Sequence, residues 1–142
     1  MNPSYPHHPF GERIDKAALQ TRLEAAQGWE AKNRLLVQLG RELPDWPATL
    51  RDDAHLVSGC ESRVWLHGEY VDGQLRLYAD SDSRIVKGLL ALVLTAYCGQ
   101  TAEMVARFDA EAWLQTLGLQ RFVSASRGNG LRAIIRHIRE YR

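Results

Sequence analysis

Apolar side chains recur three and four residues apart over two stretches near the start of the chain, a spacing typical of amphipathic helices. The first stretch predicts a helix over about residues 15–27, and the second predicts a helix over about residues 29–42. Pro44 and Pro47 end the second helix, because proline disfavours helical geometry in the residue before it. Residues 1–11 contain three prolines and no periodicity, so an irregular N-terminal arm is expected there.

The middle of the chain changes to the alternating pattern of β-strands. Residues 63–71 and 74–79 are predicted to be two strands, separated by Asp72-Gly73. This pair is typical of a type I′ turn, in which both central residues need a positive φ. A helical turn over residues 51–54 and a short strand over residues 55–57 are also expected, which would give the sheet three antiparallel strands.

Helical patterns return after the hairpin. Residues 80–83 offer several N-cap side chains, and the chain from Ile85 to Tyr97 is apolar nearly all round, broken by a single charge, Lys87. Such a helix is expected to be buried and to pack across the sheet. Shorter helices are predicted over residues 101–107 and 110–117, followed by a polar, glycine-rich connection over 124–130 and a last helix with an apolar stripe from Leu131 to Ile138.

The length and composition indicate one globular domain. The chain has 142 residues, of which 45% are hydrophobic and 25% charged. Two cysteines are too few for a disulfide scaffold, so a reducing, cytoplasmic setting is expected. Residues 1–10 do not have the pattern of a signal peptide, and the longest apolar run, over 89–96, is too short to span a membrane.

Charge is distributed unevenly along the chain. Residues 121–142 carry six arginines and one glutamate, whereas residues 1–120 carry 12 basic and 16 acidic side chains. The basic end is interpreted as the solvated face of a helix, with docking of an acidic partner or RNA as the alternative. Nucleic acid is the weaker alternative, because no aromatic side chains lie between the arginines as stacking platforms.

One cysteine lies in a segment with the composition of a loop. Ser58-Gly59 cannot easily prolong a regular element, whereas Val64-Trp65-Leu66 is typical of a strand. Cys60 is therefore expected on a loop held by the sheet, where another protein can reach its thiol, as thiol exchange requires. Gly59 would let a partner backbone approach closely. Composition alone leaves another interpretation open, because free cysteine is most often a buried apolar side chain.

Other chemistry has less support in the sequence. There is no Cys-x-x-Cys pair and no pair of histidines four residues apart on a helix, so no metal site is predicted. A Cys/His hydrolase would need a histidine base close to Cys60 in space. His55 and His67 are near Cys60 in sequence, but their position relative to its thiol stays open. Cys98, at a helix end, is expected to be structural, with a redox partnership with Cys60 as the alternative.

The segment from Gly59 to Trp65 closely resembles the Gly-Cys-(Gln/Glu)-x-x-Val-Trp signature of the SufE/CsdE family of sulfur-acceptor proteins. Asn33 departs from the family pattern, where tyrosine is frequent, and is interpreted as a packing difference. Residues 8–11, Glu61 and residues 124–127 favour the CsdE branch. The other family markers follow in order along nearly the whole chain: Trp29-Glu30, Leu39-Gly40, Leu43-Pro44, Asp80-Ser81-Asp82, Ile85 to Leu89 and Gly130-Leu131.

The resemblance implies an α+β fold with a small antiparallel sheet, helices packed against it and Cys60 on a loop at its edge. It also implies a partner, a cysteine desulfurase whose pyridoxal phosphate belongs to that partner, while this chain binds no cofactor. Cys60 would accept persulfide sulfur, stimulate the desulfurase and relay sulfur to a downstream acceptor in Fe–S cluster assembly or another thiolation route. The loop residues expected to contact the partner are Gly59, Glu61 and Ser62.

Cys60 must lose its proton to act, because the thiolate is the nucleophile and a free thiol has a pKa of about 8.5. Arg63 on the same loop, and Arg127, which the resemblance places near it, are candidates for favouring the thiolate. Arg127 could instead form a salt bridge to Asp80 or Asp82 that holds helix to loop.

Two other functions stay open at this point. A non-covalent activator would reshape the desulfurase without carrying sulfur, and Cys60→Ser would then still stimulate cysteine turnover. A stand-alone thiol enzyme would work without a partner and would place a base against Cys60. The sequence favours an accessory sulfur-transfer protein over an independent enzyme.

Overall fold

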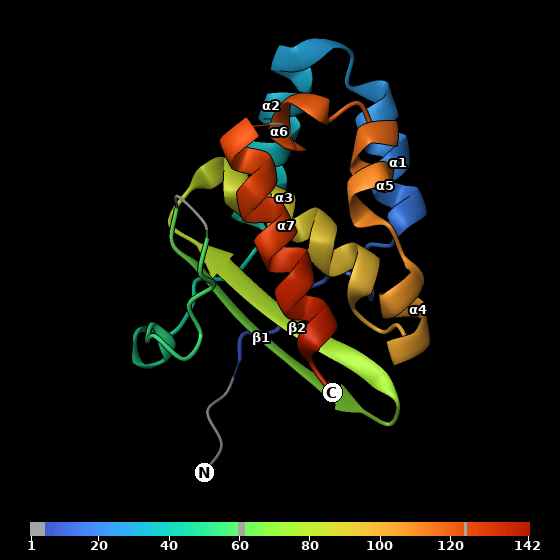
Figure 1. Ribbon diagram of the computed structural model, residues 1–142. Helices are drawn as coiled ribbons and strands as arrows, with labels where there is room; N and C mark the ends of the chain where they lie inside the picture. Colours follow the sequence, from blue (N-terminus) through green and yellow to red (C-terminus); the bar gives the residue numbers. More distant parts are fainter. Residues whose placement is uncertain (1–4, 60–61, 124) are drawn as a thin grey trace.

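The computed structural model describes residues 5–59, 62–123 and 125–142, and within them the side chains of all residues except those from 122 to 129. It confirms the predicted α+β class, with helices packed on a small antiparallel sheet (Figure 1). No helix in the described part of the chain is both long and apolar enough to cross a membrane. The elements are, in order, α1 (Lys16–Ala25), α2 (Gly28–Arg41), the 3-10 helix η1 (Ala48–Leu50), β1 (Val64–Val71), β2 (Gln74–Ser81), α3 (Arg84–Tyr97), α4 (Ala102–Arg107), α5 (Ala110–Thr116), α6 (Gln120–Val123) and α7 (Ala125–Glu140).

The hairpin forms as predicted. Strands β1 and β2 pair antiparallel from Val64 opposite Ser81 to Val71 opposite Gln74. Asp72 and Gly73 have φ values of 54° and 80°, the two positive values that a type I′ turn requires. The local turn chemistry therefore sets the register of the whole sheet.

The expected third strand is reduced to a single bridge, and in this respect the prediction is wrong. Leu56 pairs with Trp65, with hydrogen bonds from Val57 N to Val64 O (2.8 Å) and from Leu66 N to His55 O (2.8 Å). Turns on both sides of this bridge bend the backbone away before a ladder can extend. The helical turn expected over residues 51–54 is also misplaced, since the 3-10 helix η1 lies just before it.

The two faces of the sheet pack against different layers. Side chains such as Leu66 and Leu77 point into the main core beneath α3 and α7, which cross the hairpin in Figure 1. On the opposite face, Trp65 packs with Trp46 and Leu50 in a second, smaller cluster. Apolar area on both faces is thereby removed from water, which stabilises a sheet too small to stand alone.

Helix α3 is the centre of the domain, as its apolar composition predicted. Every residue from Gly88 to Tyr97 is buried, and the Oγ of Ser83 accepts a hydrogen bond from Val86 N (3.4 Å) as the N-cap. Helix α2 crosses it so closely that a Cβ on Gly88 would collide with the backbone carbonyl of Leu36. Only glycine at position 88 permits this approach.

Gly88→Ala is therefore expected to lower the free energy of unfolding by about 3 kcal/mol, the upper end of the usual cost of overpacking a core. The colliding atom belongs to backbone, so one helix must shift to make room. Urea denaturation followed by circular dichroism measures the effect. Gln38→Ala on the exposed side of α2 is the control, with an expected change within about 0.5 kcal/mol. Equal midpoints for the two variants would contradict the close crossing.

The ends of the chain differ most from expectation. The connection predicted over residues 124–130 is wrong for its described part, because α7 begins at Ala125 and includes Gly128 and Gly130. Glycine weakens a helix without forbidding it, and the buried stripe from Leu131 to Ile138 stabilises α7 through tertiary packing. The short helix α6 was not predicted.

The N-terminal arm is irregular, as expected, but from Tyr5 onward it is anchored. Phe10 is fully buried, and the Nε2 of the buried His8 donates to Leu77 O (2.7 Å). Further along the same edge of β2, Leu75 exchanges backbone hydrogen bonds with Gln100 (2.9 Å) and Gly99 (2.8 Å). The outer edge of the sheet is thus covered along these residues, which limits pairing with other chains.

Candidate functional site: the loop around position 60

Cys60 and Glu61 lie outside the described residues, so the site is defined by the residues that border them. Ser58 and Gly59 are exposed on one side, and on the other side Ser62 is partly exposed and Arg63 exposed. Gly59 has a φ of 93°, which side-chain-bearing residues rarely adopt. A Cβ on it would lie 3.4 Å from the Cβ of Ala133, so this part of the loop lies against α7.

The loop begins and ends on paired backbone. Val57 donates to Val64 O at 2.8 Å, and the Leu56–Trp65 bridge follows directly beneath it. Val57, Val64 and Leu66 are buried. Both ends of the loop, at Val57 and Val64, are therefore held by paired backbone, as the sequence predicted.

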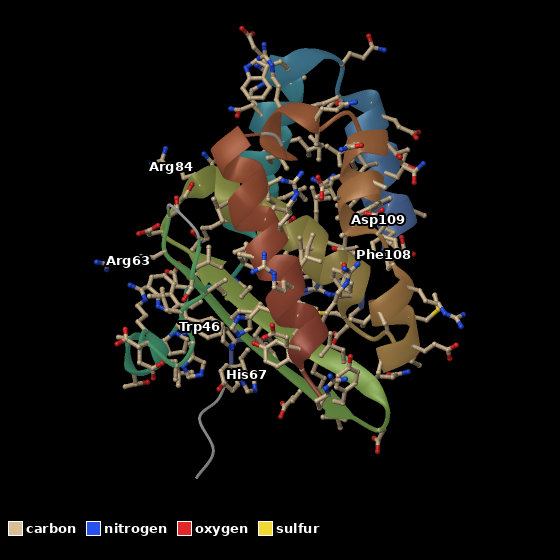
Figure 2. All side chains as sticks on the ribbon, viewed as in Figure 1. Trp46, Arg63, His67, Arg84, Phe108 and Asp109 are labelled. Atoms are coloured by element: carbon tan, nitrogen blue, oxygen red, sulfur yellow. The ribbon has the colours of Figure 1, made fainter. Side chains whose placement is uncertain are left out.

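Asp82 binds the backbone at the C-terminal end of the loop. Its Oδ1 accepts from Arg63 N (3.1 Å), its own N–H donates to Arg63 O (3.3 Å), and Ser81 Oγ also donates to Arg63 O (2.6 Å). The guanidinium of Arg63 points away from the molecule, and Figure 2 labels it beside the loop. The side chain of Arg127 lies outside the described residues, so both roles considered for it, favouring the thiolate and pairing with Asp80 or Asp82, stay predictions.

Asp80 forms the support beneath this end of the loop. Its side chain is only 2% exposed and pairs with Lys87 Nζ at 3.2 Å. It also accepts from Trp46 N (2.7 Å) and Ser81 N (2.8 Å). The described ionic partner of Asp80 is thus Lys87. Sequence reasoning missed this role, although the position of Lys87 as the one charge in the apolar stretch from Ile85 to Tyr97 was a signal that it has a buried partner.

The two histidines considered as bases belong to a cluster on the outer face of the sheet. His55 Nδ1 lies 2.6 Å from Asp52 Oδ1, and His55 Nε2 lies 2.9 Å from Tyr5 Oη. His67 stacks on the Tyr5 ring, with 4.0 Å between ring centroids, and burial lowers its pKa. Both rings are engaged in holding the N-terminal arm, so neither is identified as a base for thiol chemistry. Across residues 5–59, 62–123 and 125–142, no group of three or more His, Cys, Asp or Glu side chains could hold a metal ion.

Cys98 has the environment of a structural cysteine. It follows α3 at the covered edge of β2, where its Sγ donates to Leu77 O (3.4 Å) and lies 3.9 Å from His8 Nε2. Burial raises the pKa of its thiol to about 12. The structural interpretation of Cys98 is therefore favoured over a redox role.

In a Cys60→Ser protein, Cys98 is accordingly expected to react slowly with a disulfide reagent such as Ellman's reagent at pH 8. A thiol with a pKa of about 12 is ionised in only about one molecule in ten thousand at that pH. The ionised fraction, and with it the rate, should rise as the pH is raised. Reaction in urea, where the chain is unfolded, is the control and should finish within minutes. Equally fast reaction of the folded protein would contradict the burial of this thiol.

The chain matches known proteins over almost its whole length. A family model described as SufE, an Fe–S metabolism associated domain, matches residues 17–142. The chain belongs to the SufE family. The sulfur acceptor protein CsdE of Escherichia coli is 40% identical over 134 residues, which cover 94% of this chain and 91% of CsdE. An uncharacterized SufE-like protein of Rhizobium etli is 35% identical over 139 residues, covering 93% and 94% of the two chains.

These SufE-family matches confirm the family predicted from the motif around position 60, and the similarity to CsdE supports the predicted branch. A solved structure shares the fold: the solution structure of a hypothetical protein from Thermus thermophilus superposes with a TM-score of 0.67. It covers 89% of this chain and 93% of that one at 21% identity, so it supports the fold alone.

Proposed function

We propose that this SufE-family chain is a sulfur acceptor that takes persulfide sulfur from a cysteine desulfurase onto Cys60. Family membership and the similarity to CsdE, a sulfur acceptor protein, support the acceptor role. One observation carries the choice of residue. The chain has two cysteines, and Cys98 is buried with a pKa raised to about 12, which leaves Cys60, bordered by exposed loop residues, as the candidate thiol.

The transfer is a thiol exchange. The Cys60 thiolate attacks the outer sulfur of the desulfurase persulfide, a new S–S bond forms on Cys60, and the S–S bond of the donor breaks. The donor cysteine leaves as a thiolate, so no outside oxidant or reductant is needed. The loop is suited to this step because its paired base positions the backbone, while the residues bordering Cys60 remain open to a second protein.

The other parts of the proposal follow from the same chemistry. Pyridoxal phosphate belongs to the desulfurase, and this chain binds no cofactor of its own. Removing sulfur from the donor frees that enzyme for another turnover, so the chain stimulates it. A downstream protein then takes the sulfur from Cys60, toward Fe–S cluster assembly or another thiolation route. Arg63, the exposed cation nearest to the thiol in sequence, is proposed to favour the thiolate in the docked complex.

The test is to measure alanine formed from L-cysteine by a desulfurase of the type that serves CsdE-like acceptors, while this chain is titrated in. Turnover is expected to rise and saturate with the concentration of the chain. The chain alone should consume neither L-cysteine nor peroxide. Activity without the desulfurase would support a stand-alone thiol enzyme, and an unchanged rate with it would contradict the acceptor function.

A further inference from the structure

A basic depression lies beside the loop, between the end of α2 and the start of α3. It has a volume of about 220 Å³ and is lined by Val37, Gly40, Arg41, Arg84 and Lys87. Gly40 allows the two helices to approach here, since a Cβ on it would lie 2.9 Å from Lys87 Cβ and 3.1 Å from Arg84 O. The depression is therefore a fixed feature of the α2–α3 crossing.

Two of its three cations have no partner in the described part of the chain. Lys87 pairs with Asp80 and with Asp45. The exposed guanidinium groups of Arg41 and Arg84 make neither ion pairs nor side-chain hydrogen bonds with any described residue. No carboxylate is among the residues that line the depression. Arg41 and Arg84 thus present positive charge that no described residue compensates.

The depression adjoins the C-terminal end of the loop. Arg84 follows two residues after Asp82, whose carboxylate accepts from Arg63 N at 3.1 Å. Figure 2 shows Arg84 and Arg63 on the same side of the molecule, beside the loop. A protein that brings a persulfide to position 60 must cover this side.

We propose that Arg41 and Arg84 form a docking surface for an acidic segment of the cysteine desulfurase, seated in the depression while sulfur passes to Cys60. The inference rests on the proposed function and names the chemistry by which the donor is recognised. Guanidinium groups match carboxylates in geometry and charge. Two cations without a partner among the described residues suit a short segment with a few carboxylates. Single-stranded nucleic acid is instead bound along longer basic grooves with aromatic platforms, which this lining lacks.

The experiment titrates desulfurase turnover with the double variant Arg41→Glu/Arg84→Glu. Charge complementarity at the rim of an interface acts mainly on association. The concentration giving half-maximal stimulation is therefore expected to rise about tenfold or more, with the maximal turnover unchanged. Raising the salt concentration should increase that value for the wild-type chain and much less for the double variant. Arg22→Glu, at an exposed arginine on α1, is the matched control and should stay within about twofold of wild type.

The outcomes separate the two proposals. Absence of stimulation by the wild-type chain would contradict the acceptor function itself. Stimulation by wild type together with a double variant that behaves like Arg22→Glu would overturn only the docking surface. A double variant that accepts sulfur normally but passes it on more slowly would also overturn the docking surface, because these arginines would then contact the receiving protein. The same holds for a double variant that no longer binds a single-stranded RNA probe but leaves the desulfurase titration unchanged.

Discussion

Replacing Cys60 with serine is expected to reduce desulfurase turnover to the rate of the desulfurase alone at every concentration of the variant. A serine hydroxyl is not ionised near neutral pH and cannot hold a persulfide, so the acceptor step is lost completely. The measurement is alanine formation from L-cysteine. This result separates a sulfur acceptor from a non-covalent activator, because an activator without a sulfur-carrying role would keep its effect after the substitution.

Cys98→Ala is the matched control for that experiment. Because Cys98 is buried and its thiol has a raised pKa, removing it should leave stimulation intact. The variant should lose only stability, by about 1–2 kcal/mol, from the missing sulfur contacts in the core. Full stimulation by Cys60→Ser would contradict a sulfur-carrying role for Cys60, and loss of stimulation in a folded Cys98→Ala would show that Cys98 takes part in the transfer.

Asp80→Ala is expected to have the largest effect on stability of the substitutions considered, about 3–5 kcal/mol in the free energy of unfolding. Its carboxylate is 2% exposed and pairs with Lys87. Its loss leaves that ammonium with only the exposed Asp45 and leaves the buried N–H of Trp46 without its acceptor. Uncompensated buried polar groups are costly because the surroundings cannot replace water. Urea denaturation followed by tryptophan fluorescence measures the change.

Two further variants isolate the cause. Asp80→Asn keeps an acceptor for Trp46 N and removes only the charge, so a smaller loss is expected. Asp45→Ala removes the outer partner of Lys87. Because the side chain of Asp45 is 89% exposed, this substitution should change the free energy of unfolding by no more than about 0.5 kcal/mol. If Asp80→Ala were as mild as Asp45→Ala, the buried carboxylate would not be a structural support of the loop.

Asp80 also connects stability to function. It lies next to Ser81 and two residues before Asp82, both of which bind the backbone of Arg63 at the end of the loop. A shift of this turn would therefore move the base from which position 60 is presented. Positioning of a reacting group depends on such supporting contacts.

The parts of the fold that sequence predicted well depend on chemistry close in the chain. Asp72-Gly73 sets the hairpin because both residues accept positive φ, and α3 is buried because it is apolar on every side. The family motif around position 60 identified the loop in the same way. In each case the deciding residues are neighbours.

The parts that sequence missed depend on contacts between distant residues. Nothing local marks His8 as a partner of Leu77, which lies 69 residues away. The contact of Asp80 with Trp46 spans 34 residues. The glycines near the start of α7 indicated a loop, yet packing of the apolar stripe further along favours a helix. Local preferences of this size, about 1 kcal/mol per glycine, are readily outweighed by tertiary packing.

The central claim is tested most directly by locating the transferred sulfur. The chain is mixed with the desulfurase and L-cysteine, trapped with an alkylating reagent, digested and analysed by tandem mass spectrometry. The account predicts an added mass of about 32 Da, one sulfur atom, on the peptide that contains Cys60 and none on the peptide that contains Cys98. Sulfur found on Cys98, or on neither cysteine while the desulfurase is turning over faster, would contradict it.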